Sequence, residues 1–201
     1  KNFDLVIIDT KIVNCHHIKN YKFFAPVVYF DDLGREDLPV DILINNHFWA
    51  NKKYYKNLVN SKILLGIEYN TINPEYFKQC KKKQSSLLIT MGGNDEHENT
   101  IWLLENISEL LNDFEVFICI GPMYKNKGKI IKLAKDNLDN YKIYNSPNTL
   151  IQIMKKCSFS LSASGTTCYE LAAARVVMGL FVDDDDQTKL HKKILKEKIG
   201  F

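Results

Sequence analysis

The sequence contains few arginines and no cysteine pattern of the kind that holds a metal. Of its 27 basic residues, only Arg35 and Arg175 are arginines, so the chain has few guanidinium groups that could bind a phosphate with two hydrogen bonds. The five cysteines form no C-x-x-C pair, and an odd number suits reduced thiols better than a disulfide framework. We therefore expect no metal site, a reducing and hence cytoplasmic location, and binding of any phosphate by backbone amides.

Long apolar runs and dense positive charge are also missing. No stretch approaches the roughly 18 to 20 apolar residues that cross a bilayer, so we predict no transmembrane segment. The net charge is +3, and the lysines are spread along the chain apart from one compact cluster at residues 81 to 83. A nucleic-acid-binding surface is denser than this, so we predict no nucleic-acid partner. The oligomeric state is left open.

What the sequence does contain is a series of short apolar runs of strand length. They lie at residues 4–9, 27–32, 41–46, 63–69, 86–93, 114–121, 141–145, 159–164 and 176–182. Helical patterns occur between the later runs, at residues 98–112, 127–138, 148–157 and 166–174. This alternation of strand and helix predicts an α/β fold with open parallel sheets.

A change in the pattern of predicted strands and helices near the segment CKKKQSS indicates two domains. The first eighty residues have short strands, more loop and no strong helix except at residues 50–60, whereas strand and helix alternate strongly afterwards. We predict that residues 1–82 are the end of one Rossmann-like domain and that residues 83–201 form a second. Because the chain opens directly into a strand without an initiator methionine, we expect the first domain to be incomplete in this chain.

Two turns of small residues follow predicted strands and are suited to an anion. In T-M-G-G-N-D, Gly92 and Gly93 let the backbone approach a ligand, and the next helix points N–H groups at it; a tight turn without a ligand is the alternative. In S-A-S-G-T-T-C-Y-E-L, Thr166 and Thr167 stand in the first turn of a helix. Glu170 can accept hydrogen bonds from paired hydroxyls such as those of a ribose, or form a capping box with Thr167.

Other polar residues have simpler interpretations. The run D-D-D-D-Q-T at residues 183–188 favours a solvated loop, because hard-cation loops space their ligands alternately. Within it, Gln187 can hydrogen-bond sugar hydroxyls without the cost of desolvating a charge. No histidine stands in a metal or triad spacing, and we expect His191 at the surface. Asp9 is a candidate catalytic base, with a loop-capping carboxylate as the alternative.

In their order these segments resemble a known family. IIDT, YFDDLGREDLPVDILINN, LLGIEYNTINPEYF, LLITMGGND and SLSASGTTCYELAAA are together similar to the UDP-sugar hydrolase of pseudaminic-acid biosynthesis and its SpsG-like relatives in spore-coat-polysaccharide biosynthesis. The likeness covers nearly all 201 residues. It implies a GT-B architecture with two Rossmann-like domains and cleavage of a UDP-diacetamido-trideoxyhexose by water, and we predict no cofactor. The alternatives are glycosyl transfer from a UDP-sugar and a non-catalytic nucleotide-sugar-binding module.

The resemblance also implies roles for individual residues. The diphosphate is bound by Gly92, Gly93, Asn94, Ser164, Gly165, Thr166 and Thr167. The ribose is bound by Glu170, the uracil edge by Tyr144 and Asn145, and the sugar by Gln187 and the position of Tyr169. The G-x-G-H loop of the family, whose histidine positions or activates the attacking water, does not occur in this sequence. We therefore expect the catalytic histidine to lie outside this chain.

Overall fold

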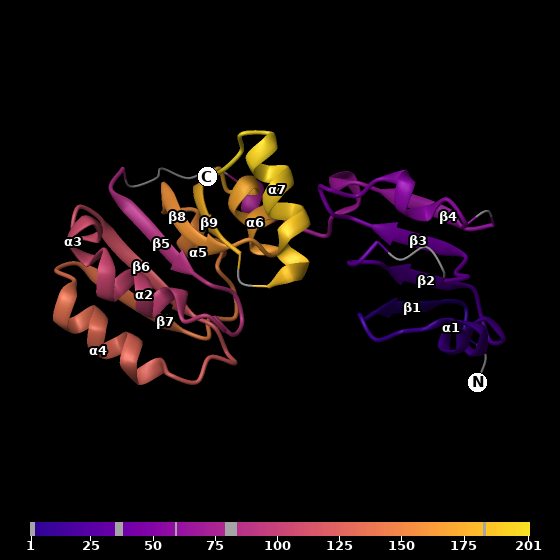
Figure 1. Ribbon diagram of the computed structural model, residues 1–201, viewed down its shortest axis with the longest axis horizontal. Helices are drawn as coiled ribbons and strands as arrows, with labels where there is room; N and C mark the ends of the chain where they lie inside the picture. Colours follow the sequence, from indigo (N-terminus) through magenta and orange to yellow (C-terminus); the bar gives the residue numbers. More distant parts are fainter. Residues whose placement is uncertain (1–2, 35–37, 59, 79–83, 183) are drawn as a thin grey trace. The chain divides into compact units, whose positions relative to one another are not determined.

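Figure 1 shows the computed structural model, which describes residues 3–34, 38–58, 60–78, 84–182 and 184–201. The chain divides into two compact units, Lys1–Thr71 and Ile72–Phe201. The predicted boundary between residues 82 and 83 lies outside the described residues, and it stays a prediction.

The first unit is a four-stranded sheet in which every pair of neighbouring strands is parallel. In spatial order its strands are β1 (Val6–Asp9), β2 (Val27–Phe30), β3 (Ile42–Asn45) and β4 (Lys62–Leu65). The helical segments are α1 (Cys15–Lys22), η1 (Lys52–Tyr55) and η2 (Ile67–Tyr69). Ile8, Tyr29 and Leu43 of the strands share a core cluster with Ile18 of α1.

Helix α1 was not predicted, and the described residues between 50 and 60 contain only the single 3-10 turn η1. Helix α1 begins where the Asn14 side chain accepts a hydrogen bond from the His17 amide at 3.0 Å. Ile18 is its one buried residue, so the helix has no repeating apolar face that a sequence pattern would reveal.

The second unit is a five-stranded parallel sheet. In spatial order its strands are β7 (Tyr141–Asn145), β6 (Glu115–Ile120), β5 (Ser86–Thr90), β8 (Phe159–Ala163) and β9 (Val177–Phe181). The helical segments are η3 (Pro74–Phe77), α2 (Asn99–Asn106), α3 (Ser108–Leu111), α4 (Lys127–Asn137), α5 (Ile151–Met154), α6 (Thr167–Ala173), η4 (Asp185–Gln187) and α7 (Thr188–Lys196).

The order of the strands in this second sheet points to one edge as the ligand side. The chain moves outward from β5 through β6 to β7 and then returns to the other side of β5 for β8 and β9. Helices α3 and α4 lie on one side of the sheet, and α6 and α7 lie on the other (Figure 1). In such doubly wound sheets, ligands bind at the carboxyl ends of the strands beside the point of reversal. That point lies between β5 and β8.

The core of the second unit holds this edge in place. Every residue of β5 and β6 is buried, as expected for central strands that are covered on both faces. Ile89 and Ile118 of these strands cluster with Leu104 of α2 and Ile130 of α4. The loops after β5 and β8 therefore project from a rigid support.

Two predicted helices are shorter than expected. The pattern at residues 98–112 forms α2 and α3, which are separated at Ile107, where φ is −131°. Next to this break the Asn106 side chain donates to the Trp102 carbonyl at 2.9 Å, a local bond of the kind that competes with helical structure. The helix expected at residues 148–157 is reduced to α5, where the Ile151 amide donates to the Thr149 hydroxyl at 3.2 Å.

Candidate functional site

The loop after β5 begins with a turn that suits glycine. Gly92 has a φ of +73°, in the left-handed region that side chains disfavour. Gly121, after β6, lies directly against this turn: a Cβ atom there would come within 2.2 Å of the Gly92 carbonyl oxygen and 2.3 Å of the Gly93 carbonyl oxygen. The Met123 amide also donates to the Gly93 carbonyl at 3.0 Å. Two loops are thus packed backbone against backbone, and sequence reasoning missed the role of Gly121.

The loop after β8 turns into α6 around Ser164. This residue is fully buried; its amide donates to the Phe181 carbonyl at 2.8 Å, and its hydroxyl hydrogen-bonds His191 Nδ1 at 2.9 Å. Ser164 therefore anchors the turn from inside. Among the described residues, the amides of Gly165, Thr166 and Thr167 have no hydrogen-bond acceptor. Three neighbouring donors are left for a ligand.

The amino ends of α6 and α2 differ in the number of backbone N–H groups that they leave for a ligand. At α6, the N-cap residue is Thr166, which makes no side-chain capping bond; the alternative of a capping box between Thr167 and Glu170 requires Thr167 at the N-cap and is not observed. At α2, the buried Asp95 carboxylate accepts from the amides of Asn99 at 2.8 Å and Thr100 at 3.0 Å. The expectation that the helix after the glycine pair points N–H groups at an anion is wrong for these two amides, because a carboxylate already binds them.

Two hollows meet at these turns, and both are lined by Gly92, Gly93, Thr166 and Thr167. The first has a volume of about 270 Å³, and its lining also includes Cys119, Gly121, Pro147 and Leu150. The second has a volume of about 230 Å³, and its lining also includes Asn94, Glu96, Gly165, Asp184 and Gln187. No lysine or arginine lines either hollow within the described part of the chain. An anion bound there has to be held by amides and hydroxyls.

The fold brings together seven of the residues that the sequence singled out. These are Gly92, Gly93, Asn94, Gly165, Thr166, Thr167 and Gln187. The remaining five, Tyr144, Asn145, Ser164, Tyr169 and Glu170, do not line these hollows. The Tyr144 ring stacks on Phe117 with centroids 6.3 Å apart, Asn145 is exposed, and Tyr169 is buried. The ligand contacts assigned to all twelve residues stay predictions.

Acidic and histidine side chains gather at the carboxyl edge of the first unit. Asp32 Oδ1 lies 3.2 Å from His47 Nε2, and this hydrogen bond is the main reason why the pKa of Asp32 is lowered. Behind this pair, the Tyr55 hydroxyl donates to Asp31 at 2.8 Å and accepts from the Asn45 side chain at 2.6 Å. A local sequence pattern does not reveal these partners, because they come from other segments of the chain.

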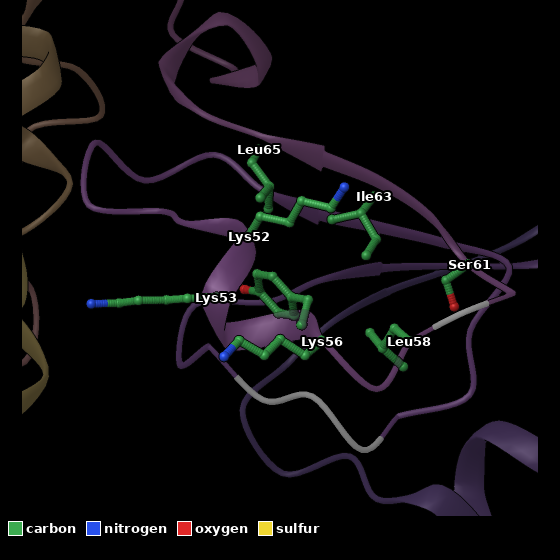
Figure 2. Close-up of a pocket in the computed structure, with 8 residues that line it drawn as sticks. Lys52, Lys53, Lys56, Leu58, Ser61, Ile63 and Leu65 are labelled. Carbon is green, nitrogen blue, oxygen red and sulfur yellow. The ribbon is translucent and has the colours of Figure 1, made fainter.

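Two further hollows lie in the first unit. Asp9 is exposed at the end of β1 and lines one of about 530 Å³; its catalytic role stays a prediction. Figure 2 shows the other, of about 860 Å³, in which Lys53 extends away from the remaining labelled side chains. Leu58 and Ile63 in its lining pack against the core of the unit, so this hollow is a depression over the hydrophobic core. It contains none of the predicted site residues.

Metal binding and membrane insertion find no support in the described residues. No group of three or more histidine, cysteine, aspartate or glutamate side chains there is placed to hold a metal ion. No helix in the described ranges has the length and apolar character needed to cross a membrane. Asp184, Asp185 and Asp186 are exposed, as predicted for a solvated loop, and Asp183 lies outside the described residues.

Comparisons with known proteins identify the fold. No protein-family model matches the chain. A curated protein of Methanocaldococcus jannaschii, named uncharacterized protein MJ1062, is 22% identical over 210 residues, which cover 96% of this chain and 43% of that protein. The structure of the pneumococcal O-GlcNAc transferase GtfA with UDP and GlcNAc matches with a TM-score of 0.53 and 13% identity, over 97% of this chain and 50% of the other.

A structure of a mutant of S. aureus TarM in complex with fondaparinux, α-GlcNAc-glycerol and UDP matches 86% of this chain and 44% of the other, with 12% identity and a TM-score of 0.49. The likeness to GtfA, together with two parallel sheets, confirms the predicted fold class: the chain has a GT-B-like α/β fold with Rossmann-like sheets. The chain spans about half the length, or less, of the proteins that it matches.

Proposed function

We propose that this chain is the UDP-sugar-binding part of a GT-B glycosyltransferase, which transfers the sugar to an acceptor hydroxyl. The observation that carries the proposal is the meeting of two hollows at the Gly92 and Thr166 turns, beside the reversal point of the second sheet. The likeness to a transferase whose structure contains UDP and GlcNAc supports this choice of ligand. The activity of the whole protein belongs to the proposal.

The chemistry needs stabilisation of the leaving diphosphate. The acceptor oxygen attacks the anomeric carbon, the bond from that carbon to the UDP oxygen breaks with its electron pair, and the acceptor proton passes to a base. Preorganised amides aimed at the developing negative charge lower the barrier to such a step. In this proposal the amides of Gly165, Thr166 and Thr167 do so. Helix α6 has only seven residues, so these local donors matter more than its dipole.

The two hollows differ in the groups that they offer to the rest of the donor. The side chains of Asn94 and Gln187 in the second hollow suit the hydroxyl and amide groups of a sugar. Pro147 and Leu150 make part of the first hollow apolar, which suits a nucleoside. We therefore place the diphosphate at the shared wall, with the sugar and the nucleoside on either side of it.

Hydrolysis of the same donor, with water in place of the acceptor, is the second candidate. The order of the sequence motifs favours it, together with a diacetamido-trideoxyhexose as the sugar, whereas the likeness to GtfA supports transfer. A cytoplasmic location is part of either proposal, and the four described cysteines support it because none of them forms a disulfide bond. A non-catalytic binding module would use the same hollows.

Binding of UDP tests the proposal directly. UDP should raise the melting temperature of the protein. At a concentration one hundred times Kd, binding increases the free energy of unfolding by about 2.7 kcal/mol. A Cβ atom at Gly165 would meet nothing within 4 Å, so Gly165→Val should fold normally while its side chain enters the second hollow. We expect this variant to bind UDP at least tenfold more weakly in calorimetry.

Gly128→Val in α4 is the matched control. The space around its Cβ position is equally open, and Gly128 lines neither hollow, so UDP affinity should be unchanged. Absence of any effect of millimolar UDP on the unaltered protein, or equal affinity in Gly165→Val, would contradict the proposed site. UDP release by the whole protein from UDP-GlcNAc, with and without sugar acceptors, separates transfer from hydrolysis.

A further inference from the structure

His191 of helix α7 is bonded to the turn that precedes helix α6. Its Nδ1 atom lies 2.9 Å from the Ser164 hydroxyl, and the two groups form a hydrogen bond. A hydroxyl both donates and accepts, so this bond forms with either neutral tautomer of the imidazole ring. The sequence predicted His191 at the surface, whereas in the structure it is half-buried. A local pattern of charged neighbours does not reveal a partner 27 residues away.

Helix α7 brings His191 to the turn from a firm support. Leu190 and Ile194 of this helix are buried and hold it against the rest of the unit. Gln187, its N-cap residue, lines the second hollow. His191 follows four residues later, and residues four apart lie on the same face of a helix. Helices α6 and α7 also lie on the same side of the second sheet (Figure 1). His191 is thus one helical turn beyond a residue of the proposed site.

Two of the three amides that we assign to the diphosphate are held by the backbone of α6. The Thr166 amide shares its rigid peptide plane with the Gly165 carbonyl, which accepts from the Cys168 amide at 3.1 Å. The Thr167 amide shares its plane with the Thr166 carbonyl, which accepts from the Tyr169 amide at 3.0 Å. The first turn of the helix therefore orients both of these N–H groups.

The Gly165 amide lacks this support. Its peptide plane contains the Ser164 carbonyl, to which no donor among the described residues is bonded. Glycine itself restricts the plane least of all residues, because it has no Cβ atom. The plane is therefore oriented by Ser164, which is fully buried and held at two points. Its amide donates to the Phe181 carbonyl at 2.8 Å, and its hydroxyl is bonded to His191.

We propose that His191 is a positioning residue, which acts through the Ser164 hydroxyl to orient the Gly165 N–H toward the UDP diphosphate. This inference rests on the proposed function, because it requires a diphosphate at the shared wall of the two hollows. His191 lines neither hollow, so it acts without touching the ligand. Its contribution should appear only with ligands that carry the diphosphate. A histidine that merely packs α7 on the unit would affect the binding of a nucleoside as much as that of UDP.

The test compares the affinities for UDP and for uridine, which lacks the diphosphate, by NMR titration. His191→Phe keeps a flat ring but has no ring nitrogen. It should bind UDP about tenfold more weakly, the effect of losing one hydrogen bond to a charged group, while its uridine affinity stays the same. Ser164→Ala removes the same bond from the other side and should have the same effect. The double variant should show no further loss, because both changes remove one shared interaction.

Two further variants make the comparison specific. His16→Phe in α1 is the matched control: this exposed histidine also has a ring-nitrogen hydrogen bond, at 3.2 Å from the Asn20 side chain, and it lies in the first unit. It should keep both affinities. In His191→Asn the side-chain amide stands close to the position of Nδ1, so UDP affinity should return to within about threefold of the unaltered protein. If His191→Phe does not fold, Ser164→Ala, which removes a single oxygen atom, makes the same comparison.

Each remaining outcome counts against a defined statement. Equal losses of UDP and uridine affinity in His191→Phe would show a purely structural role and overturn the inference. So would an unchanged UDP affinity in that variant, additive losses in the double variant, or a His191→Asn variant that binds UDP no better than His191→Phe. If the unaltered protein does not bind UDP, the proposed function itself fails, and this result is seen before any substitution is made.

Discussion

Gly121 decides how closely the loops after β5 and β6 approach each other. We predict that Gly121→Ala destabilises the protein by about 1–3 kcal/mol, as overpacking of a tight site does, and weakens UDP binding. Its Cβ atom would come within 2.2 to 2.5 Å of backbone atoms of Gly92 and Gly93, and a change of side-chain rotamer does not relieve such a contact. Urea denaturation measures the loss of stability, and calorimetry measures the affinity.

Gly128→Ala in α4 is the control, because a Cβ atom there meets nothing within 4 Å. Removing a glycine from a helix stabilises it by roughly 0.5–1 kcal/mol, so this variant should equal or exceed the unaltered protein. If Gly121→Ala unfolds at the same urea concentration as the unaltered protein, the two loops are not packed as closely as described.

Single residues were predictable where their role is local. Gly92 stands at the end of an apolar run, and its left-handed φ matches the reason for expecting a glycine turn there. Gly121 acts on a segment that is distant in the chain, namely the loop after β5. A local sequence pattern carries no information about such partners. Only the fold brings them together.

At the scale of elements, Asp95 fixes the start of α2. Asp95→Ala should cost about 0.5–2 kcal/mol of stability, the usual effect of losing a capping side chain, because the amides of Asn99 and Thr100 lose their acceptor. Asp95→Asn should cost less, since the single side-chain oxygen of asparagine still accepts one of the two hydrogen bonds and asparagine tolerates the φ of +49°. Thermal and urea unfolding would measure both changes.

Asp113→Ala is the matched control for this prediction, because Asp113 is an exposed carboxylate outside the helices. A surface change of this kind usually alters stability by less than about 0.5 kcal/mol. Equal unfolding midpoints for the Asp95→Ala and Asp113→Ala variants would mean that the Asp95 bonds contribute nothing to the helix.

The strands were easier to predict than the helices, for a physical reason. Strands β5 and β6 are buried along their whole length, so they read as unbroken apolar runs. Helix α1 buries one residue, and the helix pattern at residues 98–112 does not reveal the interruption at Ile107. Burial on both faces leaves a stronger trace in the sequence than burial of a narrow stripe.

At the scale of the whole molecule, the two units have separate hydrophobic cores. The cluster around Ile118 contains only residues of the second unit, and the cluster around Tyr29 contains only residues of the first. The α/β class and the parallel sheets followed from the alternation of strand and helix patterns. The boundary at residues 82 and 83 stays a prediction, because a change in loop composition does not reveal which short segment packs on which core.

Two truncated chains examine where the second unit begins. Residues 72–201 include η3 and should fold alone, because they hold a complete five-stranded sheet with its own core. Residues 83–201 lack η3, which contacts helix α6. If the UDP site lies wholly in the second unit, the Kd of the longer piece for UDP should be within about threefold of that of the full chain. This factor corresponds to a difference of less than about 1 kcal/mol in binding free energy.

The shorter piece should melt at a lower temperature and bind UDP more weakly, because helix α6 then lacks its contact with η3. Equal UDP affinities of the two pieces would place the functional boundary near residue 83 and remove η3 from the site. Weak binding by both would mean that the first unit contributes contacts to the nucleotide, since the second unit alone would then be insufficient.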